Sequence, residues 1–299
     1  MTRSIATRRS LHIVLTVLLC GFIAPSLATG LVFEVSRPGM PTGYLVGTLH
    51  SEDPRVIALV PALAPVIARI DALAVELVPD AVTMVAVAAA SMLPAGQDLA
   101  GRIGEARFDA LREIARERQI PVEVLMRLKP WAAAVTLGMP PTDSGRFLDM
   151  ELYLAVAAQG RRTLGLETAA EQLAVFGGIP ESTQIAMVDD LIKNAADLPK
   201  ELEALTRAWL AGDLARLEAV ARRQNAMASP AVIHWLDEVV VRARNERMLE
   251  RALPLLREGP VMVAVGALHL AGDSGLVAGL RRHGYTVEPW PGAASLSPE

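Results

Sequence analysis

Short apolar runs near both ends of the chain predict the strands of a sheet. Gly43 to His50, Ile70 to Leu77 and Val261 to Val265 are apolar stretches that end at or beside a glycine or an ionisable residue. Two further strands are predicted at Thr163 to Leu166 and near Tyr285 to Val287. Continuous apolar strands are typical of a sheet that is covered on both faces.

The middle of the chain has a helical pattern. Apolar side chains recur at helical spacing from about Asp80 to Arg161 and again from Ala169 through Leu256. The uncharged run Ala81 to Met92 is too short for a membrane span and is predicted to be a buried helix. Pro54 to Arg69 also has helical spacing, although two internal prolines make its middle irregular.

The expected fold is therefore α/β (mixed α+β). A central, mostly apolar β-sheet is built from the N- and C-terminal segments and holds a large helical insertion at about residues 80–258. The mature chain, residues 29–299, is expected to be a single domain, since no linker rich in Pro, Gly and Ser divides it.

Residues 1–28 have the pattern of a cleavable signal peptide. Three arginines precede the apolar run from Leu11 to about Leu19, and Ser26-Leu27-Ala28 offers small residues for cleavage. A periplasmic or secreted protein is therefore predicted, with no stable membrane span after cleavage. Anchoring by an uncleaved signal is the alternative.

Composition excludes several kinds of chemistry. With 52% hydrophobic residues in 299, the chain can bury a full core. Cys20 is the only cysteine and lies in the predicted signal, which excludes disulfides, zinc-thiolate sites and cysteine nucleophiles in the mature chain. The formal charge of −4 includes three signal arginines, so the mature chain carries −7, which argues against nucleic acid as a partner.

Two segments share the pattern Gly-x-Leu-His after an apolar strand: Gly47-Thr48-Leu49-His50 and Gly266-Ala267-Leu268-His269. In open α/β sheets, ligands collect at the carboxyl ends of strands, and a glycine there lets the backbone approach a ligand closely. Either histidine alone fits a hydrogen-bonded structural group, but the matched pair favours a shared site. His234 and His283 lack this context and are not expected to be ligands.

Two glutamates follow apolar strand segments in the same way. Glu76 interrupts an apolar string, and Glu167 follows Leu164-Gly165-Leu166. A buried carboxylate must be paired, hydrogen-bonded or metal-bound. Imidazole and carboxylate groups suit a divalent Zn, Mn, Co or Fe ion, which polarises a carbonyl or acidifies water. Glu76 also fits a helix cap or an ion pair, and the same alternatives stay open for Glu167.

The order of several motifs resembles the TraB/GumN family. The motifs span about Leu31 to Val287 and comprise the paired Gly-x-x-His segments, Glu76, Lys129-Pro130-Trp131, Leu148-Asp149, Gly165-Leu166-Glu167-Thr168 with Gln172, Arg244-Asn245, and Gly266 to Gly275. That family includes the Tiki proteases and is similar in fold to erythromycin-esterase-like and haem-binding ChaN-like proteins.

The resemblance implies metal-dependent hydrolysis of a peptide or amide bond, in a peptide or small-molecule substrate. It implies metal ligation by His50, His269 and Glu76, and catalytic roles for Glu76, Glu167, Arg244 and Asn245. Arg244 and Asn245 match the Arg-Asn pair of the family and are able to stabilise an oxyanion, and Arg244 is able to fix a substrate carboxylate. From spacing alone, Arg244 fits a surface run of arginines on a helix equally well.

Two other functions remain compatible with these residues. One is metal-free hydrolysis in the manner of erythromycin-esterase-like enzymes, in which a histidine acts as general base and the glutamate orients it. The other is a non-enzymatic periplasmic haem or metal carrier, for which paired histidines also suffice.

Overall fold

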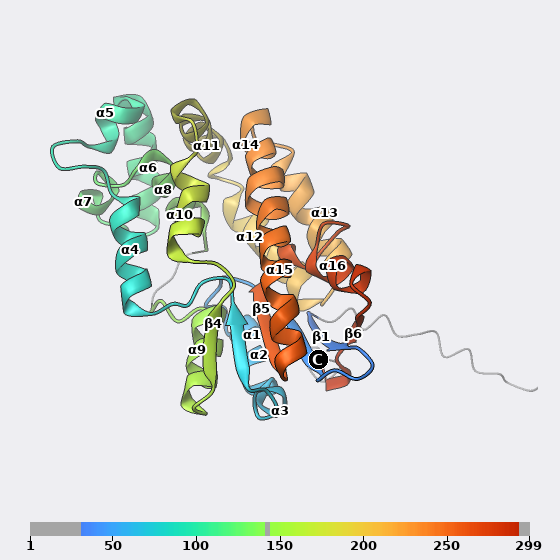
Figure 1. The fold of residues 1–299 in the computed structure, drawn as a ribbon. Helices are drawn as coiled ribbons and strands as arrows, with labels where there is room; N and C mark the ends of the chain where they lie inside the picture. The colour runs from blue at the N-terminus through green and yellow to red at the C-terminus, as the bar shows by residue number, and fades with distance from the viewer. Residues whose placement is uncertain (1–30, 141–143, 293–299) are drawn as a thin grey trace, which may run out of the picture.

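The computed structural model describes residues 31–140 and 144–292 (Figure 1). The predicted signal peptide, including Cys20, lies outside these residues. In the described ranges, no helix is both long enough and apolar enough to cross a membrane.

Six strands form one mixed sheet, in the order β4-β3-β5-β2-β1-β6. The strands are β1 (Val32–Ser36), β2 (Gly43–Thr48), β3 (Ala72–Val75), β4 (Arg162–Gly165), β5 (Val261–Gly266) and β6 (Thr286–Pro289). Neighbours among β4, β3, β5 and β2 are parallel, whereas β1 is antiparallel to both β2 and β6. Four consecutive strands therefore end at the same edge of the sheet.

Most of the remaining described residues are helical. Those before β4 are α1 (Pro54–Ile57), α2 (Leu59–Ala62), α3 (Ala64–Ile67), α4 (Ala81–Ser91), α5 (Leu99–Ile103), α6 (Glu105–Glu117), α7 (Val122–Leu125), α8 (Pro130–Gly138) and α9 (Leu148–Ala158). Those after β4 are α10 (Ala169–Gly177), α11 (Glu181–Asn194), α12 (Leu198–Leu210), α13 (Leu214–Asn225), α14 (Pro230–His234), the π-helix η1 (Trp235–Arg242), α15 (Ala243–Glu258), the 3-10 turn η2 (Ala267–His269) and α16 (Leu276–Arg282).

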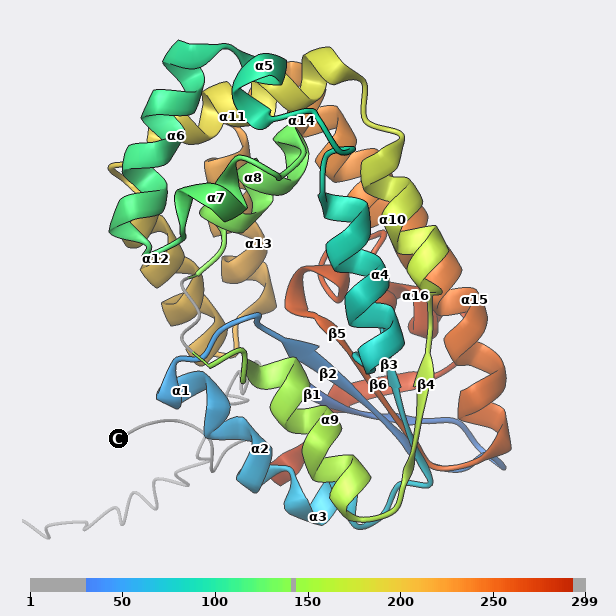
Figure 2. The ribbon, with the colours of Figure 1, turned by 90° about the vertical axis from the view of Figure 1, so that its left-hand side faces the viewer.

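The apolar core has three parts. One joins a face of the sheet to α1–α3, α9, α12 and α13 through side chains such as Leu63 and Trp209, and a second joins the other face to α15 and α16. The third lies within the helical insertion, around Leu111 and Leu137. Figure 2 shows α5–α8, α11 and α14 gathered above the sheet.

The predicted mixed α/β fold is confirmed, and the five predicted strands correspond to β2 through β6. The sequence pattern missed β1, where Glu34 interrupts the apolar residues and the burial alternates along the strand. The irregularity predicted for Pro54 to Arg69 is confirmed as three separate turns, α1, α2 and α3.

The prediction of a buried helix at Ala81 to Met92 is wrong. The segment is helical as α4, but no residue of α4 is buried, and Val82 and Val85 are 80% and 69% exposed. The Asp80 side chain caps the helix by accepting a hydrogen bond from Thr83 N, so local signals start this helix while one neighbour, α10, covers only part of it. The apolar composition of this helix therefore does not predict whether the helix is buried.

Candidate active site at the carboxyl edge of the sheet

The two Gly-x-Leu-His segments lie side by side. Strands β2 and β5 are adjacent and parallel, and Thr48 pairs with Gly266, so both histidine-bearing turns leave the same edge. Strands β3 and β4 continue this edge, because Glu167 N donates to Glu76 O at 2.8 Å. The carboxyl ends of four neighbouring strands thus supply the two histidines and the two glutamates that the sequence singled out.

Arg244 connects three of these side chains from the first turn of α15. Its Nη2 lies 2.5 Å from Glu76 Oε2 and 2.6 Å from Glu167 Oε2, its Nε lies 2.8 Å from Glu167 Oε2, and its Nη1 lies 3.3 Å from His269 Nε2. Burial disfavours the charge of Arg244, but Glu76 and Glu167 outweigh this and raise its pKa. Arg244 is buried, so its alternative as a surface arginine is wrong.

Glu76 has a partner for each carboxylate oxygen. Oε2 faces Arg244, and Oε1 accepts a hydrogen bond of 2.7 Å from Gly266 N. Burial raises the pKa of Glu76, but the positive charge that His269 carries when protonated, the charge of Arg244 and the Gly266 N–H outweigh it, so the pKa lies below its ordinary value. A Cβ at Gly266 would lie 3.3 Å from Oε1, which explains why glycine suits this close approach.

His269 is a buried, oriented imidazole. Its Nδ1 lies 2.6 Å from Asn245 Oδ1, and the Asn245 amide is itself oriented because Nδ2 donates to Ser274 O at 3.0 Å. Nδ1 therefore carries the proton and Nε2 is left as an acceptor, 3.9 Å from Glu76 Oε1. Burial lowers the pKa of His269, so the ring is neutral near pH 7. Asn245 acts here on His269 and not on an open oxyanion position.

Glu167 is enclosed by arginines. Its side chain is fully buried, Oε2 faces Arg244, and Oε1 accepts from Arg247 Nη1 at 2.8 Å. The N-cap of α10 is Thr168, which forms a capping box with Glu171. Of the two structural alternatives for Glu167, the ion pair is therefore present and the cap is not.

His50 is the accessible member of the group. Its side chain is 39% exposed, and its ring lies against Phe147 with 3.5 Å between the ring centroids. Burial lowers the pKa of His50, and the charges of Glu76 and Glu52 oppose this without reversing it. His50 is thus a neutral imidazole at pH 7 that lies within the field of Glu76 and is open to solvent.

Asp149 joins the site, although the sequence assigned it no role beyond the family motif. It lies in the first turn of α9; its Oδ1 accepts from Thr48 Oγ1 at 2.5 Å, and its Oδ2 lies 3.8 Å from His50 Nδ1. Burial raises the pKa of Asp149 to about 6, with the Glu76 charge adding to the effect and the Thr48 hydrogen bond opposing it. Only the Leu148-Asp149 motif could have signalled this residue, because an acid in the first turn of a helix is common.

A model of the TraB/PrgY/gumN family matches residues 31–289. The chain belongs to this family. The resemblance drawn from the motifs is thereby confirmed over nearly the whole described chain.

The relatives include proteins named as uncharacterized and one named as a metalloprotease. The chain is 25% identical to the uncharacterized protein YbaP of Shigella flexneri and to that of Escherichia coli K12, in each case over 255 residues covering 83% of this chain and 91% of the relative. It is also 25% identical, over 206 residues, to the metalloprotease TIKI1 of Danio rerio, a match that covers 60% of this chain and 40% of TIKI1. No solved structure matches the chain.

The family raises the question of a metal ion, and the donor arrangement does not fit one. Within residues 31–140 and 144–292, no three His, Cys, Asp or Glu side chains are grouped as ligands. Both oxygens of Glu76 already accept hydrogen bonds, and the Arg244 guanidinium faces His269 Nε2 and adds positive charge where a cation would bind. The three expected ligands therefore lie at the carboxyl edge of the sheet but do not form a coordination shell in this arrangement: His50, Glu76 and His269.

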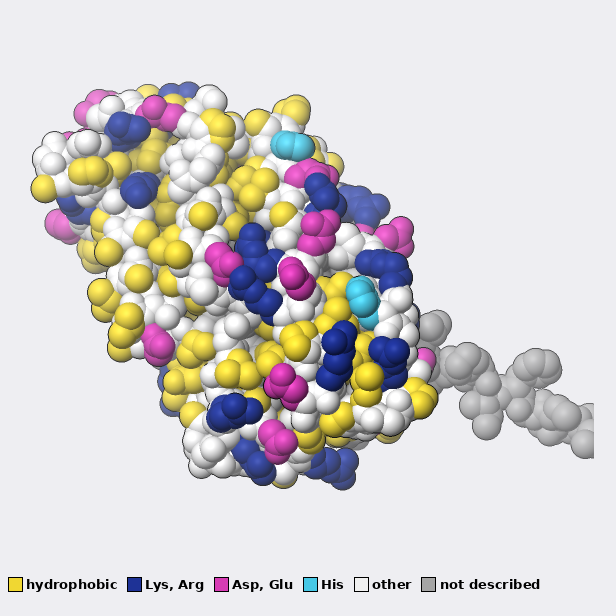
Figure 3. All heavy atoms as spheres, viewed as in Figure 1, with side chains coloured by type: hydrophobic (Ala, Val, Ile, Leu, Met, Phe, Trp, Pro, Cys, Tyr) yellow, Lys and Arg dark blue, Asp and Glu magenta, His cyan; other side chains and the backbone are white. Residues whose placement is uncertain are grey.

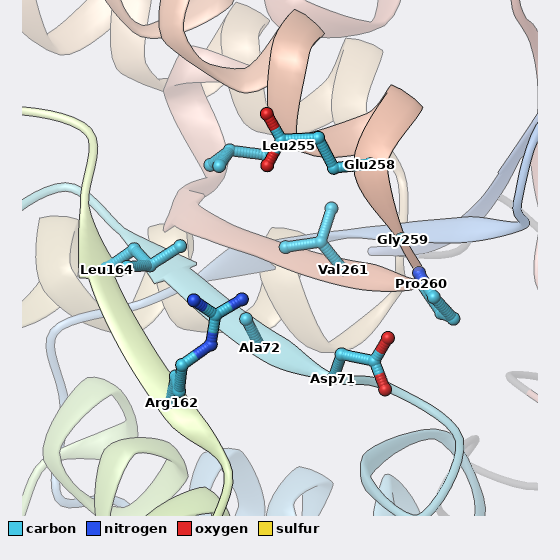
Figure 4. A pocket seen from close by; sticks show the side chains of 9 residues that line it. All are labelled: Asp71, Ala72, Arg162, Leu164, Leu255, Glu258, Gly259, Pro260 and Val261. Carbon is cyan, nitrogen blue, oxygen red and sulfur yellow. The ribbon is translucent and has the colours of Figure 1, made fainter.

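A small depression lies at the opposite edge of the sheet (Figure 4). It has a volume of about 70 Å³ and is lined by the first residues of β3, β4 and β5 and by the end of α15: Asp71, Ala72, Arg162, Leu164, Leu255, Glu258, Gly259, Pro260 and Val261. This volume is far below the few hundred cubic ångströms typical of a ligand pocket, so we assign it no role in binding.

Proposed function

We propose that the protein is a hydrolase that cleaves a peptide or other amide bond, with His50 as the general base that activates water. The observation that carries the proposal is that one edge of the sheet holds both a partly exposed imidazole with a lowered pKa, His50, and a charge-balanced group of Glu76, Arg244, Glu167 and His269. An imidazole that is neutral near pH 7 is well suited to take a proton from water.

The proposed reaction needs only groups of this chain and water. His50 removes a proton as the water oxygen attacks the carbonyl carbon, which gives a tetrahedral oxyanion. The protonated ring then returns that proton to the leaving nitrogen as the C–N bond breaks. The same ring thus serves as base and then as acid, and the protons balance.

Arg244 is the proposed source of positive charge for the oxyanion. Its contacts with Glu76, Glu167 and His269 leave one N–H of Nη1 without a partner among the described residues. The two carboxylates fix the guanidinium, so it need not reorganise as negative charge develops. Glu76, Glu167 and Asn245 act in this proposal by orienting Arg244 and His269.

A metal-dependent hydrolase is the second candidate. Two observations favour it: the Danio rerio relative is named a metalloprotease, and His269 turns Nε2 toward Glu76 while Nδ1 is held by Asn245, as is usual for metal-bound histidines. In this candidate, His50, Glu76 and His269 would hold the ion once Arg244 moved away, and the ion would supply Lewis-acid chemistry. The arrangement described here requires that rearrangement first.

One experiment separates these functions. Protein purified without chelators is analysed for metal content and incubated with a peptide library, and cleavage is read by mass spectrometry. The native protein is compared with His50→Ala, His269→Ala and the double variant. Cleavage that persists after EDTA and disappears in His50→Ala supports the His50 base.

Other results of the same experiment would support one of the alternative functions. Stoichiometric metal that is lost in His269→Ala, together with cleavage that EDTA abolishes, supports the metal-dependent candidate and overturns the metal-free base. A Soret band with no cleavage of any peptide supports a haem carrier. Exposed His234 provides the control, since His234→Ala is expected to change neither metal content nor cleavage.

We also propose that the chain is exported. The arginines before Leu11 and the small residues at Ser26 to Ala28 support a cleaved signal, and the family match begins only at residue 31. N-terminal sequencing of the protein isolated from its native cells tests this proposal: a mature end near Thr29 is expected, and an intact Met1 in a membrane fraction would indicate the uncleaved anchor.

A further inference from the structure

The segment that carries His50 is attached to the first turn of α9. Leu148 N donates to Ser51 O at 3.2 Å, and Ser51 is buried. The two segments are about a hundred residues apart in sequence, so this contact fixes the His50 loop against an element of the insertion. The side chains that α9 presents to His50 are therefore held at a defined distance.

Asp149 bridges the end of β2 and the loop that follows it. Thr48, which is 2% exposed, donates to Oδ1 of Asp149 at 2.5 Å and so orients the carboxylate. The other oxygen, Oδ2, lies 3.8 Å from Nδ1 of His50, which is beyond hydrogen-bond distance but close enough for electrostatic attraction. One carboxylate thus contacts the last residue of a central strand and faces the imidazole two residues further on.

Phe147 limits the tilt of the same imidazole. The ring planes of His50 and Phe147 are inclined by 39°, and their centroids are only 3.5 Å apart. An aromatic ring on one face and a carboxylate beside Nδ1 leave few orientations for the histidine.

We propose that Asp149 is a positioning residue that, with Thr48 and Phe147, holds His50 in the tautomer that carries its proton on Nδ1 and presents Nε2 to the reacting water. The catalytic consequence rests on the function proposed above, whereas the ring orientation does not. His269 reaches the same tautomer through a different acceptor, the Asn245 amide oxygen. In this proposal both imidazoles carry their proton on Nδ1, and a different residue orients each ring.

The test uses the tautomer of His50 in Asp149→Asn. Thr48 is expected to keep donating to Oδ1 of the new amide, so the Nδ2–H of that amide will face His50 Nδ1. A donor in that place favours Nδ1 as an acceptor without a proton. The proton is expected to move to Nε2. Long-range ¹H–¹⁵N spectra of the full chain, labelled at its five histidines, report the tautomer, and the His50 signals are those that disappear in His50→Gln.

A second variant and a control keep the test specific. Thr48→Val preserves the shape of a buried side chain but releases the carboxylate, so a mixture of tautomers is expected for His50. Asp53→Asn changes an acid three residues from His50 that caps α1 and pairs with Arg55, and it is expected to leave the His50 spectrum unchanged. All variants are checked for cooperative thermal unfolding.

The outcomes are distinct. If His50 keeps its proton on Nδ1 in Asp149→Asn, or if Asp53→Asn shifts it equally, the positioning role is overturned. For a peptide found to be cleaved, kcat of Asp149→Asn is expected to fall by about 10- to 100-fold with KM nearly unchanged. An inverted tautomer with normal kcat overturns the catalytic consequence, and an inverted tautomer in a protein that cleaves nothing overturns only the proposed hydrolase function.

Discussion

Arg244 is the residue on which the buried charges of the site depend. Two carboxylates face its guanidinium at 2.5 and 2.6 Å: that of Glu76, whose side chain is 24% exposed, and that of Glu167, whose side chain is fully buried. The aliphatic part of the side chain is buried as well, so the arginine contributes to packing and to charge balance together.

Replacing Arg244 by Met is therefore expected to destabilise the protein by about 3–5 kcal/mol, because the buried carboxylate of Glu167 and the partly buried carboxylate of Glu76 both lose a counter-charge. Urea unfolding followed by circular dichroism measures the change. Arg242→Met is the matched control two residues earlier, where the pairs with Glu238 and Glu246 are exposed to solvent and a much smaller loss is expected. Equal losses in the two variants would contradict the central place given to Arg244.

Asp149 makes stability depend on pH in a defined direction. Its folded-state pKa of about 6 lies above the model-compound value of 3.8, so the folded protein binds this proton more tightly than the unfolded chain does. The associated stabilisation is complete below about pH 4 and is lost as the pH rises through about 6. The difference in the free energy of unfolding between the native protein and Asp149→Asn is therefore expected to favour the native protein more at pH 4.5 than at pH 7.5.

Urea unfolding of both proteins at the two pH values checks this expectation, and the difference between the proteins cancels the other titrating groups. A native advantage that grows as the pH rises would mean that Asp149 is stabilised as the anion. In that case the carboxylate would face a charged His50 rather than a neutral one.

Sequence reasoning predicted that most of the candidate residues lie together, but it missed several of their contacts. The paired motifs placed His50 and His269 on one edge, because similar Gly-x-Leu-His segments end two strands that are neighbours in the sheet. The same reasoning missed the Asp149 contact, because it depends on how α9 docks against β2, and no local pattern encodes the approach of residues about a hundred positions apart. It also could not foresee that Asn245 and Glu167 would be fully engaged by His269 and the arginines.

The π-helix η1 lies just before Arg244 in the chain. The wider turns of Trp235–Arg242 give way to the α-helix at Ala243, one residue before Arg244. Arginines 244, 247 and 251 then lie on one face of α15, and all three contact the segment between β4 and α10. Such π segments are common at functional sites, and this one ends two residues before the arginine that contacts Glu76 and Glu167.

The glycine that opens the first histidine motif is required by packing. A Cβ on Gly47 would lie 2.5 Å from Leu270 Cδ1 and 3.1 Å from Ala267 Cα, so β2 and the η2 turn could not keep their present distance. Gly47→Ala is expected to cost about 1–3 kcal/mol and to reduce cleavage, because the two histidine turns would move apart. Gly138→Ala is the control, since a Cβ on Gly138 meets nothing within 4 Å.

Thermal unfolding and the peptide assay check this pair of variants. Gly138→Ala is expected to be neutral or slightly stabilising, because alanine favours the helix α8. A neutral Gly47→Ala would show that the contact between the two turns is looser than described and would weaken the link between the glycine and the site.

The strands were easier to predict than the environment of the helices. Continuous apolar runs identified β2, β3 and β5 because these strands are covered on both faces. Helix α4 has the same apolar character but lies exposed, and Figure 3 shows hydrophobic side chains gathered on this face of the molecule. Burial of a helix depends on which neighbours cover it, and periodicity within the helix does not contain that information.

At the scale of the whole molecule, the two ends of the described chain meet in the sheet and enclose the insertion. Strand β5, close to the C-terminus, lies between β3 and β2, and β6 adds to β1 at the edge. The chain between β3 and β5 comes back to the sheet at β4 and again at α15. Glu167 follows β4, Arg244 lies in α15, and the two side chains contact each other in the site. The site is therefore assembled only when the whole described chain is folded.

The same organisation predicts how the protein responds to metal removal. Within the described residues, protein groups already satisfy the site: Glu76 by Arg244 and Gly266, Glu167 by Arg244 and Arg247. EDTA treatment followed by dialysis is thus expected to shift Tm by less than about 2 °C, since a stabilising ligand adds free energy only through differential binding to the folded state. A larger fall, reversed by Mn²⁺ or Zn²⁺ but not by Mg²⁺, would mean that Arg244 yields its place to a cation in solution. The metal-dependent mechanism would then replace the His50 base as the explanation of this site.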